Sequence, residues 1–503
     1  MLTAENIVVI LSAGWLWIST LFHIAAFLIV VLHCLYSRKE SASAVLWIFV
    51  AWSLPGIGPL LYLMFGVNRV PAKGWHKRHS NKELRNARLA READEAMPLV
   101  YWRALHDALA TEPNTPFARE MNGTMNTMLP DFPLLDGNRV EPLIAGDEAY
   151  PAMIEAIRAA RHHIHMQTFI LGNDRVGRMF LDALQERARA GVKVRLLYDR
   201  VGSSRAWMGR MFSRYARTPN MRIAGWTQIH PLKRHMQINL RNHRKLLVAD
   251  GHTAFMGGLN IRDENITAAK TEAIRDYHFR VHGPIVQELQ YAFMTDWYFA
   301  TDEDAETLLT REHFPHIASE GHALVRVVNG GPETETEVIG ETFFAAIVAA
   351  RKTLLTVTPY FVPTPDIVRA FRSAALRGVD VRLVVPARNN HVYAGLAGRS
   401  FYDTLLSAGV RLFERPPPFM HAKAMLVDDE LALVGTANLD TRSLRLNYET
   451  NLAVYDAVFI DKLKRIMLED ISLSTELELS TWRRRPLRKQ MAENFCRLLS
   501  PIL

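Results

Sequence analysis

Two separate stretches of the chain combine a histidine, a lysine and an aspartate at one fixed spacing. The lysine follows the histidine by two positions, and the aspartate follows the lysine by five. The stretches are "RNHRKLLVADG", with His243, Lys245 and Asp250, and "MHAKAMLVDDE", with His421, Lys423 and Asp428. An imidazole can attack an electrophilic centre or move a proton, and an ammonium group can hold an anionic oxygen. The pattern predicts one site built from two copies.

Each aspartate is followed ten positions later by an asparagine in a loop of small residues, Asn260 in "GGLN" and Asn438 in "GTAN". Small residues let a ligand approach the backbone closely. We therefore count the two asparagines, together with Gly258 and Thr436, among the candidate binding residues.

The elements that carry these residues occur twice. Helical patterns alternate with apolar runs, and "AGVKVRLLY" in the first half matches "RGVDVRLVV" in the second. The repeat predicts an α/β fold with mixed sheets flanked by helices, as a first domain over 136–315 and a second over 322–480. Residues i and i+2 of a strand share a face, so we expect His243 and Lys245 to project together, and His421 and Lys423 likewise.

The repeat also aligns two acids, Asp276 in "RDYHF" and Glu449 in "NYETN". An acid bonded to the far nitrogen of a histidine fixes its tautomer, so these acids are candidates for orienting the two imidazoles. For Asp250 and Asp428, a turn anchor or salt bridge behind the site stays open beside a catalytic role. The further histidines are interpreted as core or surface residues: His162, His163, His165, His278 and His282.

The N-terminal region predicts a membrane anchor over 1–66. Residues 7–36 and 44–65 contain no charged side chain, and about 20 apolar residues suffice to cross a bilayer. We expect a hairpin of two transmembrane helices, at about 14–36 and 44–65. The alternative is a signal peptide cleaved near "SASA", which the second apolar run and the missing basic n-region disfavour.

The charge distribution favours a cytoplasmic location for the bulk of the chain. The linker over 67–135 begins with a run of basic residues, which the positive-inside rule places in the cytoplasm. The net charge of +8 suits an anionic partner. The tail over 481–503 is basic and amphipathic, and either lies on an anionic membrane surface or is a solvated helix. Cys34 and Cys496 offer neither a disulfide framework nor a zinc cluster.

The doubled pattern resembles the motifs of the phospholipase D superfamily. The chain is also similar to bacterial cardiolipin synthases. This similarity rests on the two apolar N-terminal stretches, on "TPYFVP" at Thr358–Pro363 and on "GTANLDTRSLRLNYE". The resemblance implies two tandem phospholipase D-like domains related by a pseudo-twofold axis. It also implies transfer of a phosphatidyl group from one phosphatidylglycerol to another, with release of glycerol.

For the site, the resemblance implies a phosphohistidine formed on one imidazole, which in similar enzymes is usually that of the first copy, here His243. His421 then protonates the departing alkoxide and deprotonates the incoming alcohol. Phosphate oxygens are held by the lysines and asparagines, namely Lys245, Lys423, Asn260 and Asn438, with Gly258 and Thr436 in the same loops. No metal or cofactor is required. Glu449 matches the downstream acid of the superfamily, and Asp276 follows from the internal repeat.

Several alternatives stay open at this point. A phospholipase D-type hydrolase or a phosphatidylserine synthase differs only in the acceptor. A membrane-anchored nuclease shares the fold, and a non-catalytic scaffold is disfavoured because both motifs are complete. We expect phosphatidylglycerol and other anionic phospholipids as partners, and no nucleic acid. We expect a multi-pass protein of the bacterial inner membrane. Two departures from many relatives are Gly258, where a serine is common, and Gln167, where we expect an acid.

Overall fold

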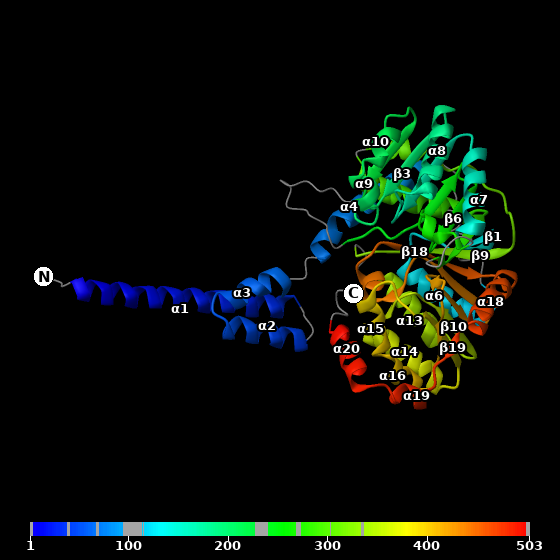
Figure 1. Ribbon diagram of the computed structural model, residues 1–503. Coiled ribbons are helices and arrows are strands. Elements are labelled where there is room, and N and C mark those ends of the chain that lie inside the picture. The colour runs from blue at the N-terminus through cyan, green and yellow to red at the C-terminus, as the bar shows by residue number, and fades with distance from the viewer. Residues whose placement is uncertain are drawn as a thin grey trace. The chain divides into compact units, whose positions relative to one another are not determined.

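A computed structural model describes most of the chain and divides it into two compact units, 1–72 and 73–503. The described residues are 4–37, 41–66, 70–93, 113, 115–226, 240–267, 273–301, 303–332 and 337–498. Figure 1 shows the elements of each unit.

The first unit holds the apolar helices. Helix α1 (Ala4–Tyr36) contains Trp17–Tyr36, the one stretch among the described residues whose length and composition suffice to cross a membrane. The second apolar stretch is not one helix. Helix α2 (Ser41–Ser53) ends before Pro55, and the chain resumes as α3 (Ile57–Leu61) and the π-helical turn η1 (Tyr62–Gly66).

The break at Pro55 has a local cause, since proline lacks an N–H and the next residue, Gly56, has a φ of 72°. Helix α3 then approaches α2 so closely that a Cβ on Gly58 would lie 2.2 Å from the Val50 carbonyl oxygen. At 13 residues, α2 is about 20 Å long, less than the roughly 30 Å of a hydrocarbon core. The expected second helix over about 44–65 is therefore interrupted, and a two-helix hairpin remains a proposal.

The basic region before the first half forms two described helices, α4 (Val70–Ala93) and α6 (Pro116–Met128). Helix α6 begins where the Thr115 hydroxyl accepts a hydrogen bond from the Ala118 N–H at 3.2 Å, with Pro116 in the first turn.

The first half alternates strands and helices as the repeat predicts. Its strands are β1 (Leu135–Ile144), β2 (His163–Thr168), β3 (Lys193–Tyr198), β4 (Met221–Gly225), β5 (Leu246–Ala249), β6 (Thr253–Gly257), β7 (Ile274–Arg275) and β8 (Tyr277–His282). Its helices are α7 (Ala145–Ala159), α8 (Arg175–Arg189), α9 (Ser204–Met208), α10 (Met211–Tyr215), the 3-10 turn η2 (Asp263–Asn265), α11 (Ile285–Ala300) and α12 (Ala305–Leu308).

The second half repeats this order and adds a C-terminal extension. Its strands are β9 (Ala323–Gly330), β10 (Thr353–Val357), β11 (Phe361–Val362), β12 (Asp380–Pro386), β13 (Arg411–Arg415), β14 (Phe419–Met420), β15 (Ala424–Val427), β16 (Leu431–Gly435), β17 (Leu439–Asp440), β18 (Glu449–Tyr455) and β19 (Thr475–Glu476). Its helices are α13 (Val338–Ala349), α14 (Pro365–Leu376), α15 (Val392–Arg399), α16 (Tyr402–Leu406), α17 (Thr441–Arg445), α18 (Ala457–Ser472), α19 (Leu479–Arg483) and α20 (Leu487–Arg497).

Fifteen of the 19 strands in the described part of the chain, from both halves, join one mixed sheet, while β11 pairs with β17 and β14 with β7 in two small sheets. The order is β19-β13-β12-β10-β15-β16-β18-β9-β1-β8-β6-β5-β2-β3-β4, in 15 strands. Outward from the central β9–β1 pair, each half runs through its equivalent strands in the same sequence, which is the arrangement that a pseudo-twofold relation gives. The halves meet through antiparallel pairing of β1 with β9, for example Leu135 opposite Val325, and Figure 1 shows both strands at this junction.

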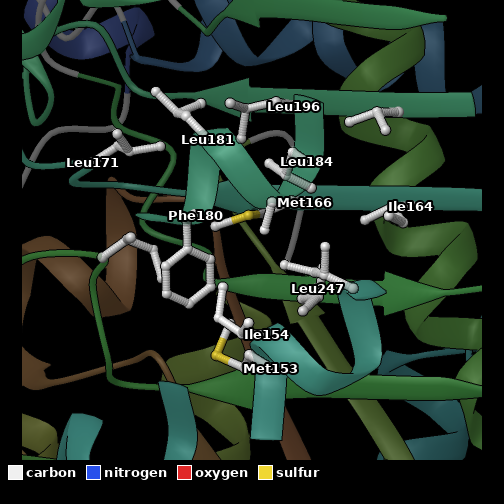
Figure 2. Close-up of a cluster of buried hydrophobic side chains, with 14 of the residues drawn as sticks. Met153, Ile154, Ile164, Met166, Leu171, Phe180, Leu181, Leu184, Leu196 and Leu247 are labelled. Atoms are coloured by element: carbon white, nitrogen blue, oxygen red, sulfur yellow. The ribbon is translucent and has the colours of Figure 1, made fainter. Parts of the chain in front are cut away.

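Helices pack on the sheet through conventional apolar cores. Figure 2 shows one such core in the first half, to which Phe180, Leu181 and Leu184 of α8, Met166 of β2 and Leu196 of β3 belong. All five side chains are at most 1% exposed. The α8 residues recur at spacings of one and three to four, which gives a helix one apolar face for the sheet. These cores hold the strand ends that carry the site.

Candidate active site

Each His-x-Lys pair lies just before a strand rather than within one. Strand β5 begins at Leu246, directly after Lys245, and β15 begins at Ala424, directly after Lys423. The strand predicted to start at the histidine is therefore shorter than expected. The reason is that each histidine segment hydrogen-bonds to the opposite half of the molecule instead of continuing the ladder.

These cross-half hydrogen bonds follow the same scheme twice. The His243 N–H donates to the Tyr448 carbonyl at 2.9 Å, directly before Glu449. The His421 N–H donates to the Arg275 carbonyl at 2.8 Å, directly before Asp276, where β14 pairs with β7. The backbone register therefore delivers the acid of one half to the histidine of the other.

Both imidazoles contact a carboxylate of the opposite half. His243 Nδ1 lies 3.0 Å from Glu449 Oε2, and His421 Nδ1 lies 2.6 Å from Asp276 Oδ2. All four side chains are buried or nearly so, with the acids fully inaccessible. With Nδ1 of each ring turned to a carboxylate, Nε2 is the nitrogen that faces no acid, and that of His421 lies 3.4 Å from Lys423 Nζ.

The two lysines belong to the same buried cluster. Lys245 Nζ donates to the His243 carbonyl at 2.5 Å, and Lys423 Nζ donates to the His421 carbonyl. Lys423 Nζ also lies 2.8 Å from His421 Nδ1 and 3.8 Å from Asp276 Oδ2. The predicted side-by-side projection of each His-Lys pair therefore holds, although the backbone there is not a strand.

Burial and mutual repulsion lower the proton affinity of the cations. Burial lowers the pKa of Lys245 to about 7, with Lys423 adding to the shift and Glu449 opposing it. Burial also lowers the pKa of Lys423 to about 8, against the opposing pull of Asp276. The pKa of His421 falls well below its usual range through burial, Lys423 and Lys245, with a contribution from His243. Since charges from both halves act on one another, the two motifs form one electrostatic site that favours an anion.

The pKa values of the two acids shift in opposite directions. Burial raises the pKa of Asp276 to about 6, although Lys423 opposes the shift. Burial acts in the same direction on Glu449, but His243 and Lys245 outweigh it and hold the pKa of that carboxyl below its usual value. Burial lowers the pKa of His243, and Glu449 opposes this. Glu449 is therefore the acid better suited to stabilise a positive charge on its imidazole.

The loops that contain the two asparagines explain part of the difference between Glu449 and Asp276. The residue after the first glycine of each loop is Thr436 in the second half and Gly258 in the first. The Thr436 hydroxyl donates to Glu449 Oε2 at 2.5 Å, so it supports the acid and is not directed to a ligand as we had expected. At the equivalent position, a Cβ on Gly258 would lie 2.0 Å from Asp276 Oδ1. Glycine thus leaves room for the carboxylate, which accounts for the absence of a serine there.

The motif aspartates lie in turns behind the site. Asp250 accepts hydrogen bonds from the backbone N–H groups of three consecutive residues, 161–163, at 2.7–2.9 Å. Asp428 accepts three from 351–353 at 2.7–2.8 Å. Each adopts a left-handed conformation with φ of 52°, which aspartate tolerates better than most residues. Their contacts are those of turn anchors rather than of groups that reach a substrate.

The two asparagines are buried, at 3% and 4% exposed. Asn260 Oδ1 accepts from the Ile170 N–H at 3.1 Å, and its Nδ2 has no partner among the described residues. Asn438 Nδ2 donates to Asp440 at 3.1 Å, and its Oδ1 is unpaired. Asn260 therefore presents an N–H suited to an anion, whereas Asn438 has one of its two N–H groups engaged.

An aromatic ring flanks each imidazole. Phe169, after β2, lies with its centroid 4.9 Å from the ring of His243, and Tyr360, after β10, lies 5.9 Å from that of His421. Tyr360 falls within "TPYFVP", a stretch that the sequence singled out without giving it a role. Each motif imidazole therefore has an aromatic neighbour from its own half.

A buried network around Asp296 was missed by the sequence and explains Gln167. Asp296 Oδ1 pairs with Arg244 at 2.5 Å and with Lys77 of α4 at 3.1 Å. Burial raises the pKa of Asp296, but these two cations outweigh it and lower the pKa to about 2. Gln167 Nε2 donates to its second oxygen at 2.6 Å, beside Asn242. The Gln167 amide can donate to this carboxylate, whereas an ionised acid at position 167 would repel it.

The remaining histidines agree with their interpretation as core or surface residues. His163, His165 and His278 are at most 1% exposed, whereas His162 is exposed and His282 is half-buried. His165 packs against His313 and Phe293, with ring centroids 5.1 and 4.9 Å away.

Comparisons with known proteins agree with this geometry. A family model described as "Cardiolipin synthase, PLD-like domain" matches residues 153–297 and 343–471, and one described as "Phospholipase_D-nuclease N-terminal" matches 15–66. A cardiolipin synthase of Geobacillus kaustophilus (strain HTA426) is 35% identical over 93% of this chain and 90% of its own. The major cardiolipin synthase of Bacillus subtilis (strain 168) is 31% identical over 96% and 98%, respectively.

A solved structure shares the fold. The phosphatidylserine synthase of Haemophilus influenzae Rd KW20 superposes with a TM-score of 0.59 at 16% identity, covering 76% of this chain and 99% of that one. At this identity the likeness concerns the fold alone. With the family model over both halves and curated relatives along nearly the whole chain, this protein belongs to the cardiolipin synthase family of the phospholipase D superfamily and is an enzyme of the phosphatidyltransferase class.

Proposed function

We propose that the enzyme makes cardiolipin and glycerol from two molecules of phosphatidylglycerol, through a phosphohistidine on His243. The observation that carries the proposal is the exchange of acids between the halves, His243 with Glu449 and His421 with Asp276. This exchange turns Nδ1 of both imidazoles to a carboxylate within one cationic cluster and leaves Nε2 of each ring for displacement at one phosphorus, with Lys423 Nζ 3.4 Å from that of His421.

In the first step, His243 Nε2 attacks the phosphorus of the donor lipid, and the bond from phosphorus to the glycerol oxygen breaks. His421 gives its proton to the departing alkoxide, which leaves as glycerol. The phosphorus is now bonded to His243, and the imidazole carries a positive charge. Ionised Glu449 opposite Nδ1 supports that charge, which favours His243 over His421 as the nucleophile.

In the second step, His421 takes the proton of a hydroxyl on the second phosphatidylglycerol. The resulting oxygen attacks phosphorus, the bond to His243 breaks, and cardiolipin leaves. In the free enzyme, burial and repulsion by Lys423 and Lys245 lower the pKa of His421. The anionic phosphate of the bound donor offsets this repulsion, so that His421 holds the proton that the first step needs. Lys245, Lys423 and Asn260 hold the non-bridging oxygens, where loss of one such donor costs roughly 10²–10³ in rate. Asp250 and Asp428 anchor turns in this scheme.

The surroundings of the site are part of the proposal. The enzyme is tethered to the bacterial inner membrane by the apolar stretches of residues 1–66, with the catalytic halves in the cytoplasm. Phe169 and Tyr360 limit the access of water, so an alcohol rather than water accepts the phosphatidyl group.

The product distribution tests the proposal. Purified full-length protein is given phosphatidylglycerol labelled in its head group in mixed micelles, and the products are resolved. Cardiolipin with labelled glycerol is expected. Phosphatidic acid alone indicates a hydrolase, phosphatidylserine formed from a CDP-activated lipid and serine indicates the synthase, and cleavage of added DNA alone indicates a nuclease; each would overturn the assignment.

A further inference from the structure

A cavity lies in the second half, beside the segment that carries Tyr360. It has a volume of about 1120 Å³ and is bounded by β11, α15, β19, α19 and α20. Pro359 and Phe361, the neighbours of Tyr360, contribute to its wall. We call it the tail cavity, because its outer wall is the C-terminal segment 475–493. Its size exceeds the several hundred Å³ of most small-ligand pockets.

The walls of the tail cavity combine apolar and cationic side chains. Phe361, Val385 and Leu396 line it, and Trp482 forms an aromatic face, with the guanidinium of Arg485 stacked 3.3 Å from the indole centroid. Apolar walls beside guanidinium groups suit a ligand that is itself amphipathic.

Three cations of the lining are not neutralised by the protein. Arg388, Arg488 and Lys489 have no ion pair with any carboxylate in the described part of the chain. By contrast, Glu476 is bonded bidentately to Arg411 at 2.7 and 2.8 Å, and Glu493 is paired with Arg485 at 3.0 Å. Glu478 is the lining carboxylate without a described ion pair. The three unpaired cations therefore outnumber it, and the net unpaired charge of the lining is positive.

The helix that bounds the cavity also presents an apolar stripe outward. Leu487, Met491, Phe495 and Leu498 are spaced by four, four and three residues, and each is 64–75% exposed. Residues at this spacing share one helix face. The opposite face, with Glu493 and Cys496, is buried against α15, and Figure 1 shows α20, in red, beside that helix. An exposed row of large apolar residues flanked by cations is the pattern of an interfacial membrane helix.

We propose that the tail cavity binds an anionic phospholipid of the bilayer, whose phosphate meets Arg388, Arg488 and Lys489 while the apolar stripe of α20 enters the membrane interface. The charge complementarity and the stripe commit this surface to a lipid occupant. The site goes beyond the proposed function, because no bond is made or broken in it.

Deuterium exchange tests the proposal on the full-length protein carrying His243→Ala, which prevents consumption of lipid. The protein is held in neutral maltoside micelles and titrated with phosphatidylglycerol or phosphatidylcholine, and deuterium uptake is followed in peptides from 479–497. Phosphatidylglycerol should slow uptake there, and phosphatidylcholine should not. The variant Arg488→Gln/Lys489→Gln should raise the midpoint of the titration about 30-fold, the loss expected for two interfacial cations.

Matched variants control for charge and hydrophobicity. Lys462→Gln on α18 removes an exposed cation elsewhere in the same half and should leave the midpoint unchanged. In lipid nanodiscs containing phosphatidylglycerol, Met491→Ser should restore exchange in α20, whereas Val458→Ser, which alters an equally exposed apolar residue of α18, should not.

Several results would overturn the proposal. These are equal slowing by both lipids, an equal effect of Lys462→Gln, the same slowing by inorganic phosphate alone, and slowing that depends on protein concentration, which would indicate a second copy of the chain. Turnover by the unmodified enzyme tests the proposed function separately, so either idea can fail alone.

Discussion

Nδ1 of His243 lies 3.0 Å from Oε2 of Glu449, across the boundary between the two halves of the protein. The two residues are 206 positions apart in the sequence. Because the reciprocal contact joins His421 to Asp276, neither half holds a complete histidine–acid pair. The site exists only when both halves have folded against one another.

Replacement of each of the two histidines should block a different step of the reaction. His243→Ala and His421→Ala should each lose at least 10²-fold in cardiolipin formation, since each loses a nucleophile or a general acid. With a phosphatidyl ester of p-nitrophenol, whose leaving group needs no proton, His421→Ala should accumulate the phosphohistidine and His243→Ala should not. Mass spectrometry of the quenched enzyme measures this. Accumulation on His421 would exchange the two roles.

Support of the acid by Thr436 should be measurable. Thr436→Val removes the hydroxyl that donates to Glu449 at 2.5 Å, and a buried bond of this kind to a charged group is worth about 1.5 kcal/mol or more. We expect roughly tenfold slower turnover. Thr436→Ser retains the hydroxyl and is the control. If both variants turn over equally fast, the hydroxyl has no role in orienting the pair.

The motif aspartates should affect stability more than chemistry. Asp250→Ala removes the shared acceptor of three consecutive backbone N–H groups and places alanine at a φ of 52°. The expected loss is about 2 kcal/mol or more of unfolding free energy, with turnover per folded molecule nearly unchanged. Asp250→Asn retains an acceptor and tolerates this φ, so it should lose less. Urea unfolding and active-site titration measure the two effects. A folded but inactive Asp250→Ala enzyme would contradict the anchor role.

Gln167→Glu should destabilise the protein in a pH-dependent way. The new carboxyl would lie near Asp296, whose low pKa keeps it ionised, so repulsion and burial raise the pKa of the new group. Its destabilising charge is present at pH 8 and partly removed at pH 5. Relative to the unmodified protein, the urea concentration at the unfolding midpoint should therefore decrease more at pH 8 than at pH 5. Gln167→Met, which lacks the charge, should show the same loss at both.

Acid should weaken the first half through its buried histidines. Burial lowers the pKa of His313 to about 4 and that of His163 and His165 well below the usual range. Their stabilising contribution is complete above the unfolded pKa near 6.5 and is lost as the pH falls below it, because the unfolded chain binds the protons first. The urea midpoint should therefore decrease from pH 7 to pH 5. His313→Gln should make this decrease shallower, whereas exposed His162→Gln should not.

The sequence alone predicted the repeat, the helix–strand units and the candidate site residues, because hydrophobic periodicity and motif spacing are local properties. The equivalence of Asp276 and Glu449 was also visible there. Tertiary structure alone decided that these acids are exchanged between halves, that β1 and β9 join the halves into one sheet, and that Gln167 faces Asp296. Each of these features depends on which distant segment of the chain a strand or loop pairs with. The spacing of motifs along a single sequence does not determine that long-range pairing.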